Sequence, residues 1–115
     1  MMCPLDYSFC NQKVTVYRRQ GQELVRQELD KCWFSLEETY TQDGYGQRLK
    51  KKCRLIVPGK QQLMAGDLVY PGVGPQVEPE RWQSFVPANV PGLSVLQWVK
   101  TYYWENKPCH TEAGC

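Results

Sequence analysis

The sequence predicts a mainly β fold, a small β-barrel or sandwich of four to six strands with one short helix and a long loop or arm. Its 115 residues suit one ordinary domain. A hydrophobic content of 42% with four Trp is enough to form a core. Several segments alternate apolar and polar residues between Gly- and Pro-containing turns. We expect an N-terminal segment or arm at residues 1–12 and a single β-rich domain at residues 13–115.

The first third of the chain predicts a hairpin. Residues 13–18 alternate in character and are rich in β-branched side chains, which fits a half-buried strand. A turn follows at residues 19–22, where Gly21 tolerates positive φ. Residues 23–36 are then best interpreted as the partner strand, with a helix over Gln22–Leu29 as the alternative. Residues 37–46 read as a polar loop or an exposed hairpin arm.

The middle of the chain predicts two further strands. Arg48–Val57 alternates, with Cys53 and other apolar residues on one face, and ends at a Pro-Gly turn. Within such apolar patterns, Cys32 and Cys53 are expected to be ordinary core thiols. Residues 65–72 predict a tight turn and a very short strand stopped by proline. An extended loop is expected at residues 71–79.

The last third contains the best predicted helix and two strands. Glu78–Val86 begins with Pro79 at a favourable first position and is stopped by Pro87. Gly92–Trp104 carries large apolar residues on both faces, which indicates a central strand or one covered on both sides. Residues 109–113 are expected to form a final short strand.

The first residues, the apolar runs and the cysteines also bear on the compartment in which the protein resides. The start of the sequence lacks the pattern of a secretory signal, so we expect a cytoplasmic chain with mostly reduced cysteines. No apolar run approaches the length of a membrane span, and we expect no membrane partner. If the chain is instead secreted, three disulfides could form among its six cysteines. Those cysteines are Cys3, Cys10, Cys32, Cys53, Cys109 and Cys115.

Catalytic and metal sites are weakly indicated. The one histidine, His110, follows Cys109 directly, and adjacent side chains on a strand point to opposite faces. No tuned nucleophile is evident, so we expect no enzyme and no cofactor. Cys109, His110 and Cys115 are weak metal-ligand candidates, because their spacing lacks the tight pairs of a zinc site.

A basic row is the sharpest electrostatic feature. Arg48, Lys50, Lys52 and Arg54 fall on one side of a predicted strand. The plain interpretation is a solvated face or a protected sheet edge. The functional interpretation is contact with the DNA backbone without base reading. The net charge of +2 is too small to indicate a nucleic-acid-binding protein by itself.

Aromatic residues outside the obvious core faces suggest protein–protein contacts, where they bury much area at low entropic cost. These interface candidates are Tyr40, Tyr45, Tyr70, Tyr102, Tyr103 and Trp104.

Taken in order, a set of short motifs over residues 13–114 resembles a family of small proteins from the head–tail morphogenesis region of tailed phages and prophages. Each motif alone is a common turn or strand sequence, and their order carries the resemblance. The motifs are Val14-Thr15-Val16-Tyr17-Arg18, Cys32-Trp33-Phe34, Leu55-Ile56-Val57-Pro58-Gly59, Ala65-Gly66-Asp67, Glu80-Arg81-Trp82, Val90-Pro91-Gly92 and His110-Thr111-Glu112-Ala113-Gly114.

The resemblance implies a structural neck component, namely a head–tail connector, stopper or tail-completion protein. Such a protein would assemble in the host bacterial cytoplasm as a homo-oligomeric ring, six- or twelve-fold, and reside in the virion neck. Its partners would be the portal or adaptor, the tail-tube or tail-terminator proteins, and the backbone of double-stranded DNA in the lumen. Two alternatives stay open: a secreted disulfide-stapled binding or inhibitor domain, and a small nucleic-acid-binding β-barrel.

Overall fold

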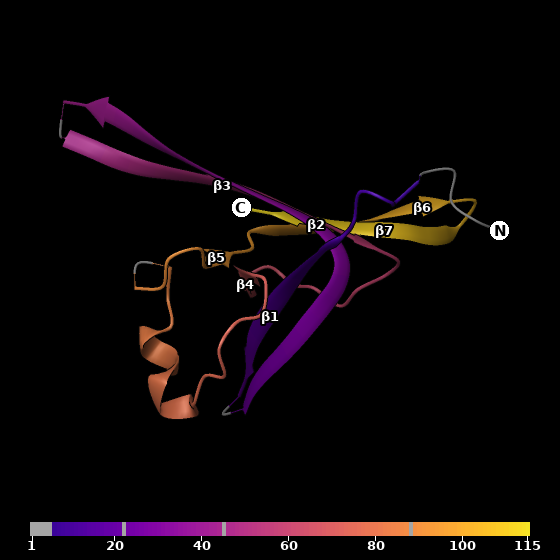
Figure 1. Ribbon diagram of the computed structural model, residues 1–115, viewed down its shortest axis with the longest axis horizontal. Helices are drawn as coiled ribbons and strands as arrows, with labels where there is room; N and C mark the ends of the chain where they lie inside the picture. Colours follow the sequence, from indigo (N-terminus) through magenta and orange to yellow (C-terminus); the bar gives the residue numbers. More distant parts are fainter. Residues whose placement is uncertain (1–5, 22, 45, 88) are drawn as a thin grey trace.

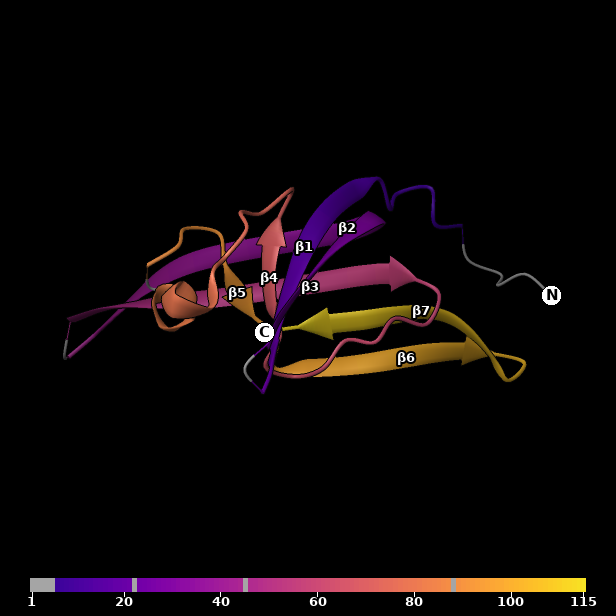
Figure 2. The ribbon, with the colours of Figure 1, turned by 90° about the horizontal axis from the view of Figure 1, so that it is seen from below.

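The computed structural model describes residues 6–21, 23–44, 46–87 and 89–115, with the side chains at 41, 43 and 47–49 left out. This part of the chain forms seven strands and one short 3₁₀ helix, η1 (Figures 1 and 2). The helix spans Pro79–Ser84. The strands are β1 (Gln12–Gln20), β2 (Glu23–Asp43), β3 (Gly46–Pro58), β4 (Leu68–Pro71), β5 (Ser94–Val95), β6 (Trp98–Trp104) and β7 (Lys107–Gly114).

All seven strands join one antiparallel sheet in the order β5-β4-β1-β2-β3-β7-β6. The sheet curls into a half-barrel because β2 belongs to both of its halves. Residues 23–32 of β2 pair with β1, whereas residues 33–43 pair with β3. Figure 1 shows the two portions of β2 running in clearly different directions. The predicted mainly β fold with one short helix is therefore confirmed, with seven strands rather than four to six.

The bend in β2 lies at Lys31, which adopts a positive φ of 56°. The register between β1 and β2 shifts at the same level, as it does at a β-bulge. Next to the bend, the buried Cys32 thiol lies 3.2 Å from the carbonyl oxygen of Gln12 and 3.4 Å from that of Leu29. Burial raises the pKa of Cys32 to about 11, so the thiol stays protonated and can donate. The prediction of a core thiol at position 32 is confirmed.

The main hydrophobic core fills the concave side of the half-barrel. It takes residues from both halves of the sheet and from the loop before β4, so the two halves share this core. Its buried members are Val14, Val16, Leu29, Cys32, Leu55, Val57, Leu63, Val69, Leu96 and Ala113. A second cluster, formed by Tyr17, Leu68, Phe85 and Leu93, holds the segment around η1 against the sheet.

Several local predictions can now be compared with the structure. Residues 23–29 form a strand and not a helix, and residues 37–46 belong to a hairpin arm rather than a loop. The predicted helix at Glu78–Val86 is shorter and is of the 3₁₀ type. It ends at Ser84 because the next residue, Phe85, turns into the second cluster, where its ring packs 4.7 Å from that of Tyr17.

The prediction of one central strand over Gly92–Trp104 is wrong. The segment is broken at Leu96 and Gln97, where it crosses from one half of the sheet to the other. Leu96 donates its backbone N–H to the carbonyl of Asp67, and Gln97 donates to that of Gly114. Leu96 therefore packs in the core, and β6 lies at the edge of the sheet with exposed aromatic side chains. No helix in the described residues is long and apolar enough to cross a membrane.

A buried ion pair ties the end of β1 to the turn before β4. Arg18 Nε lies 2.8 Å from Asp67 Oδ1, and its Nη2 lies 2.7 Å from Oδ2. Asp67 is 2% exposed and also accepts the backbone N–H of Met64 at 2.9 Å. The hydrogen bonds that Arg18 donates to Asp67 raise the pKa of Arg18 above its usual value. This pair fixes the loop that carries the core residue Leu63.

We predict that Arg18→Met strongly destabilises the fold, because it leaves the Asp67 carboxylate buried without its cation. The expected loss is about 3 kcal/mol in the free energy of unfolding, measured by urea denaturation. Lys13→Met is the control, since Lys13 pairs with Asp30 at an exposed site and its loss should cost less than about 1 kcal/mol. Equal effects of the two substitutions would contradict this role of the buried pair.

Candidate functional site: the outer face of the arm

The arm is the part of the β2–β3 hairpin that extends beyond the other strands, residues 36–43 of β2 and 46–53 of β3. Pairing of β1 with β2 stops at Cys32, and pairing of β7 with β3 begins at Arg54. The arm strands consequently have strand partners only across the hairpin in the described part of the sheet. Eight residues of β-strand span about 26 Å. Figure 1 shows the arm projecting away from the body at one end of the molecule.

Strand register divides the side chains of the sheet into two faces. Leu36 on β2 and Cys53 and Leu55 on β3 share the face that contacts the core, which we call the inner face. The opposite side is the outer face. From β2 to β6, its described members are Trp33, Ser35, Glu37, Thr39, Lys50, Lys52, Arg54, Ile56, His110, Glu112, Trp98, Lys100 and Tyr102.

The predicted basic row lies on this outer face. Lys50 and Lys52 are exposed, and neither forms an ion pair with another described residue. Arg54 stands at the root of the arm and is already paired, with its Nη2 at 3.5 Å from Glu112 Oε2. The backbone of Arg48 pairs with Thr41, but its side chain lies outside the described residues. Two cations of the row are thus available to an external anion.

Arg54 belongs to a polar network that the sequence did not reveal. Glu112 lies between Arg54 and His110, with its Oε1 3.6 Å from His110 Nε2. The hydroxyl of Tyr7 lies 2.6 Å from His110 Nδ1, and the ring of Tyr102 stacks on the imidazole at 4.9 Å. His110 and Glu112 are both 8% exposed. The network therefore brings residues of the N-terminal segment, β3, β6 and β7 together on the outer face.

The hydrogen bonds of this network hold the N-terminal segment against β7. Burial, and then the charges of Cys10 and Glu112, raise the pKa of Tyr7, so its phenol remains a proton donor at neutral pH. One hydrogen bond joins this phenol to His110 Nδ1, and the other ring nitrogen, Nε2, faces Glu112. A hydrogen bond to Glu112 also raises the pKa of Tyr102. The arrangement pins the N-terminal segment to β7.

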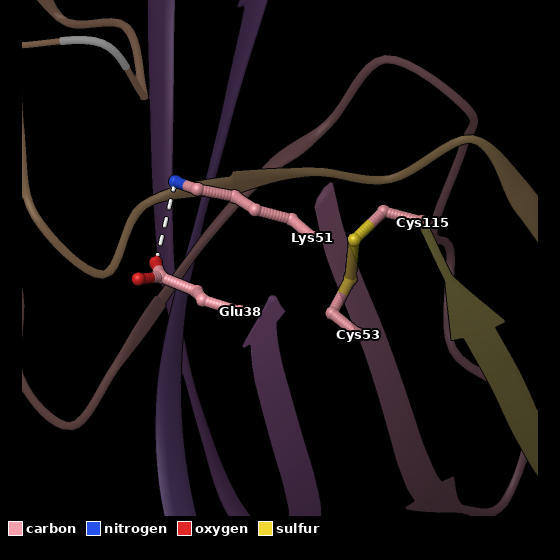
Figure 3. The surroundings of a disulfide bond; sticks show 4 residues. All are labelled: Glu38, Lys51, Cys53 and Cys115. Atoms are coloured by element: carbon pink, nitrogen blue, oxygen red, sulfur yellow. Dashed lines mark ion pairs between the residues drawn. A yellow bond between two sulfur atoms is a disulfide. The ribbon is translucent and has the colours of Figure 1, made fainter. Parts of the chain in front are cut away.

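A disulfide joins the root of the arm to the last residue of the chain (Figure 3). Cys53 on β3 is bonded to Cys115 just after β7, with 5.1 Å between their Cα atoms. The prediction that Cys53 is a core thiol is therefore wrong, because its β7 neighbour brings a second cysteine within bonding distance. Beside the bond, Lys51 pairs with Glu38 at 3.7 Å on the inner face.

The other cysteines divide into two groups. Cys10 and Cys32 are buried free thiols, so the alternative with three disulfides is not formed, although the expectation of mostly reduced cysteines does not hold for Cys53, Cys109 and Cys115. Cys109 is also disulfide-bonded, and Cys3 lies outside the described residues. Bonded sulfurs at 109 and 115 cannot act as thiolate ligands. Among the described residues, no group of three or more His, Cys, Asp or Glu is placed to hold a metal.

The aromatic interface candidates occupy different environments. Tyr40 on the arm is 65% exposed, and Tyr103 and Trp104 on β6 are exposed as well. Tyr70 is partly buried against the second cluster, and Tyr102 is held on His110. Tyr45 lies outside the described residues.

Comparison with known proteins adds no relative. No family model matches the chain, and no curated protein or solved structure is significantly similar to it. The candidate site therefore depends on the geometry described above.

Sequence reasoning missed two members of the outer face that bear on its charge and shape. Lys100 on β6 lies opposite Glu112 and places its ammonium over the Tyr102 ring at 4.8 Å. Tyr7 has no periodic or motif signal, because its partner is 103 residues away in the chain. Alternation within Gly92–Trp104 does place Lys100 on one face with Trp98 and Tyr102, but only the strand order shows that this is the face of Lys50 and Lys52.

We predict that Tyr7→Phe loosens the N-terminal segment, because the buried Nδ1 of His110 loses its hydrogen-bond donor. The expected loss is about 1–2 kcal/mol in the free energy of unfolding, with faster amide exchange at residues 6–11. Tyr103→Phe is the matched control, since Tyr103 is 57% exposed. Unchanged exchange at residues 6–11 would show that the hydrogen bond does not hold this segment.

Proposed function

We propose that this protein is a structural component of the neck of a tailed phage, a head–tail connector, stopper or tail-completion protein that forms a ring around the passing DNA. The observation that carries the proposal is the arm, a hairpin that pairs with no other strand in the described part of the chain. It presents Lys50 and Lys52, which form no ion pair with another described residue. An isolated two-stranded hairpin is marginally stable, so an arm of this kind is best explained by contact with another molecule.

The motifs of the phage-like resemblance support the proposal by the way they fit together. Arg18, which ends the first motif, binds Asp67 of the Ala-Gly-Asp motif. Residues 55–58 pair with residues 110–113, joining two further motifs, and the Thr111 hydroxyl donates to the carbonyl of Gly59. The residues of these motifs therefore form contacts within the fold. The arm tip and the edge of the sheet are left for contacts with portal, tail proteins and further copies of the chain.

The basic row fits contact with passing DNA whose base sequence is not recognised. Lysines on an exposed strand hold phosphates as point charges, and they carry no base specificity. A small number of such contacts on each subunit, repeated around a ring, gives a weakly basic lining. The near-balanced charge of the chain as a whole fits this local role, because strong binding would hinder passage of DNA.

We predict that Lys50→Glu/Lys52→Glu weakens binding of the assembled protein to random-sequence duplex DNA. Loss of two phosphate contacts on one subunit should lower the slope of log affinity against log salt by about 1.8, measured by fluorescence anisotropy. The control is Lys60→Glu/Lys107→Glu, which has the same charge change at two other exposed lysines. In particles, the Lys50/Lys52 variant should impair DNA retention or ejection.

The outcomes separate the candidate functions. Rings in negative-stain images, together with weaker DNA binding of the Lys50/Lys52 variant alone, would support the neck component. Steep salt-dependent binding by a strictly monomeric chain would favour a small nucleic-acid-binding β-barrel instead. Unchanged infectivity of particles that carry the Lys50/Lys52 variant would refute the lumen lining.

The Cys53–Cys115 bond favours a second candidate, a secreted binding or inhibitor domain stapled by disulfides. Disulfides persist in oxidising compartments, which include extracellular fluid and the surface of virions. The bond is therefore compatible with both candidates once the protein has left a reducing cytoplasm, and the state of the thiols before release distinguishes them.

We predict that Cys53 and Cys115 are reduced while the chain is in the host cytoplasm. Cells lysed directly into a denaturing alkylating reagent should give peptides labelled at both positions, detected by mass spectrometry without reduction, because denaturation exposes the buried Cys53. Cys32, a free thiol in the structure, should be labelled in every sample and serves as the internal control. Recovery of the chain solely as a cross-linked, exported molecule would reject the neck component in favour of the secreted domain.

A further inference from the structure

The C-terminal half of the sheet has two open edges at opposite ends of its strand order. This four-stranded unit runs β2-β3-β7-β6, with the arm portion of β2 at one edge and β6 at the other. Within the described residues, β6 pairs only with β7, and the arm portion of β2 pairs only with β3. Open edges present unpaired backbone N–H and C=O groups that can pair with another strand.

The β6 edge has little of the protection that usually prevents such pairing. It is seven residues long and contains no proline, and it exposes three large aromatic residues. Trp98 is 41% exposed, Tyr103 57% and Trp104 46%. One lysine, Lys100, interrupts this surface. A long edge strand rich in exposed aromatic residues is typical of a strand that binds another chain.

The directions of β6 and β2 allow the two edges to pair with each other in an antiparallel arrangement. Each neighbouring pair in the four-stranded unit is antiparallel, so β6 runs opposite to β2. When a second copy is placed beside the first by rotation about an axis roughly along the strands, its β2 arm lies antiparallel to β6. The sheet then continues from copy to copy with alternating strand directions throughout.

The charges of the two arm strands make the β2 edge, and not the β3 edge, the better partner for β6. The β3 edge carries Lys50, Lys51 and Lys52, which would repel Lys100. The β2 edge carries Glu37, which is exposed, and Glu38, which already pairs with Lys51 on the inner face. Glu37 and Lys100 both lie on the outer face, so a continuous sheet would place them on the same side. Opposite charges on neighbouring strands stabilise the pair.

We propose that β6 of one copy of this chain pairs with the β2 edge of the arm of the next copy, with Glu37 and Lys100 on the shared outer face. This inference rests on the proposed ring and identifies the surfaces that would form it. The contact is head-to-tail, because two different surfaces meet, and head-to-tail contacts build rings when the rotation closes. Since the arm projects past the level of β6, neighbouring copies are staggered along the strands, as strands in a closed barrel are.

The test is a charge exchange read by the size of the assembly. Glu37→Lys and Lys100→Glu should each raise the concentration for half-assembly by roughly fivefold per contact, measured by light scattering after size-exclusion chromatography. The double variant Glu37→Lys/Lys100→Glu should restore assembly, because the opposite charges are again paired. Glu80→Lys/Lys60→Glu is the matched control, with the same exchange at two exposed sites elsewhere.

A second measurement uses the unmodified chain and does not depend on the folding of variants. Amide hydrogen exchange in β6 and in residues 36–43 should slow as the protein concentration rises, whereas exchange in η1 should not change. Equal exchange at low and high concentration, or a chain that stays monomeric, would overturn the proposed pairing. Failure of the double variant to assemble although it is folded would do the same.

These results also separate this inference from the proposed function. Rings whose assembly is insensitive to Glu37→Lys and Lys100→Glu would refute the edge pairing and leave the neck component standing. Assembly that depends on both residues but gives open filaments without DNA binding would support the pairing and count against the neck component.

Discussion

The bend at Lys31 and Cys32 is the constraint on which the rest of the structure depends. A straight strand of 21 residues would keep β1 and β3 in one plane, and the sheet would then be a flat ribbon without a shared core. The positive φ at Lys31 turns the second part of β2 away from β1, and the buried Cys32 thiol fills the corner against the carbonyls of Gln12 and Leu29. The two halves of the sheet can therefore enclose one core, and the arm is directed away from it.

Strands and turns could be predicted from the sequence because their signals are local. Alternation identified β1, β3 and the short β4, and Gly21 marked the first turn. The bend could not be predicted, since lysine rarely adopts positive φ and gives no signal for it. The break at Leu96 was also missed, because both faces of that segment are apolar and only the crossing between the two halves explains it.

The candidate site was predicted in part for the same reason. The basic row follows from period-two alternation, and Lys50 and Lys52 are indeed exposed together on one face. The partner of Arg54 could not be foreseen, because Glu112 becomes its neighbour only when β7 pairs with β3. The Cys53–Cys115 bond depends on the same pairing. Contacts between residues far apart in sequence thus decide which of the predicted cations are neutralised within the chain.

The polar groups inside the fold and the charged groups on the arm have different surroundings. Several buried polar groups are paired within the fold, as Arg18 is with Asp67 and Thr15 with the carbonyl of Gly72, whereas Arg26 Nε and Ser94 Oγ have no hydrogen-bond partner among the described residues. Lys50 and Lys52 form no ion pair with another described residue, and they lie on the arm, where a neighbouring molecule can reach them.

The covalent bond at Cys53 also determines how the arm responds to mechanical load. Tension applied to the tip along β3 reaches Cys53 first, where the disulfide and the hydrogen bond from Cys115 N to the Cys53 carbonyl both join β3 to the end of β7. With the disulfide formed, the force divides between β3 and the end of β7, so the hydrogen bonds between the two strands do not carry all of it. The root of the hairpin is then held by a covalent bond as well as by hydrogen bonds.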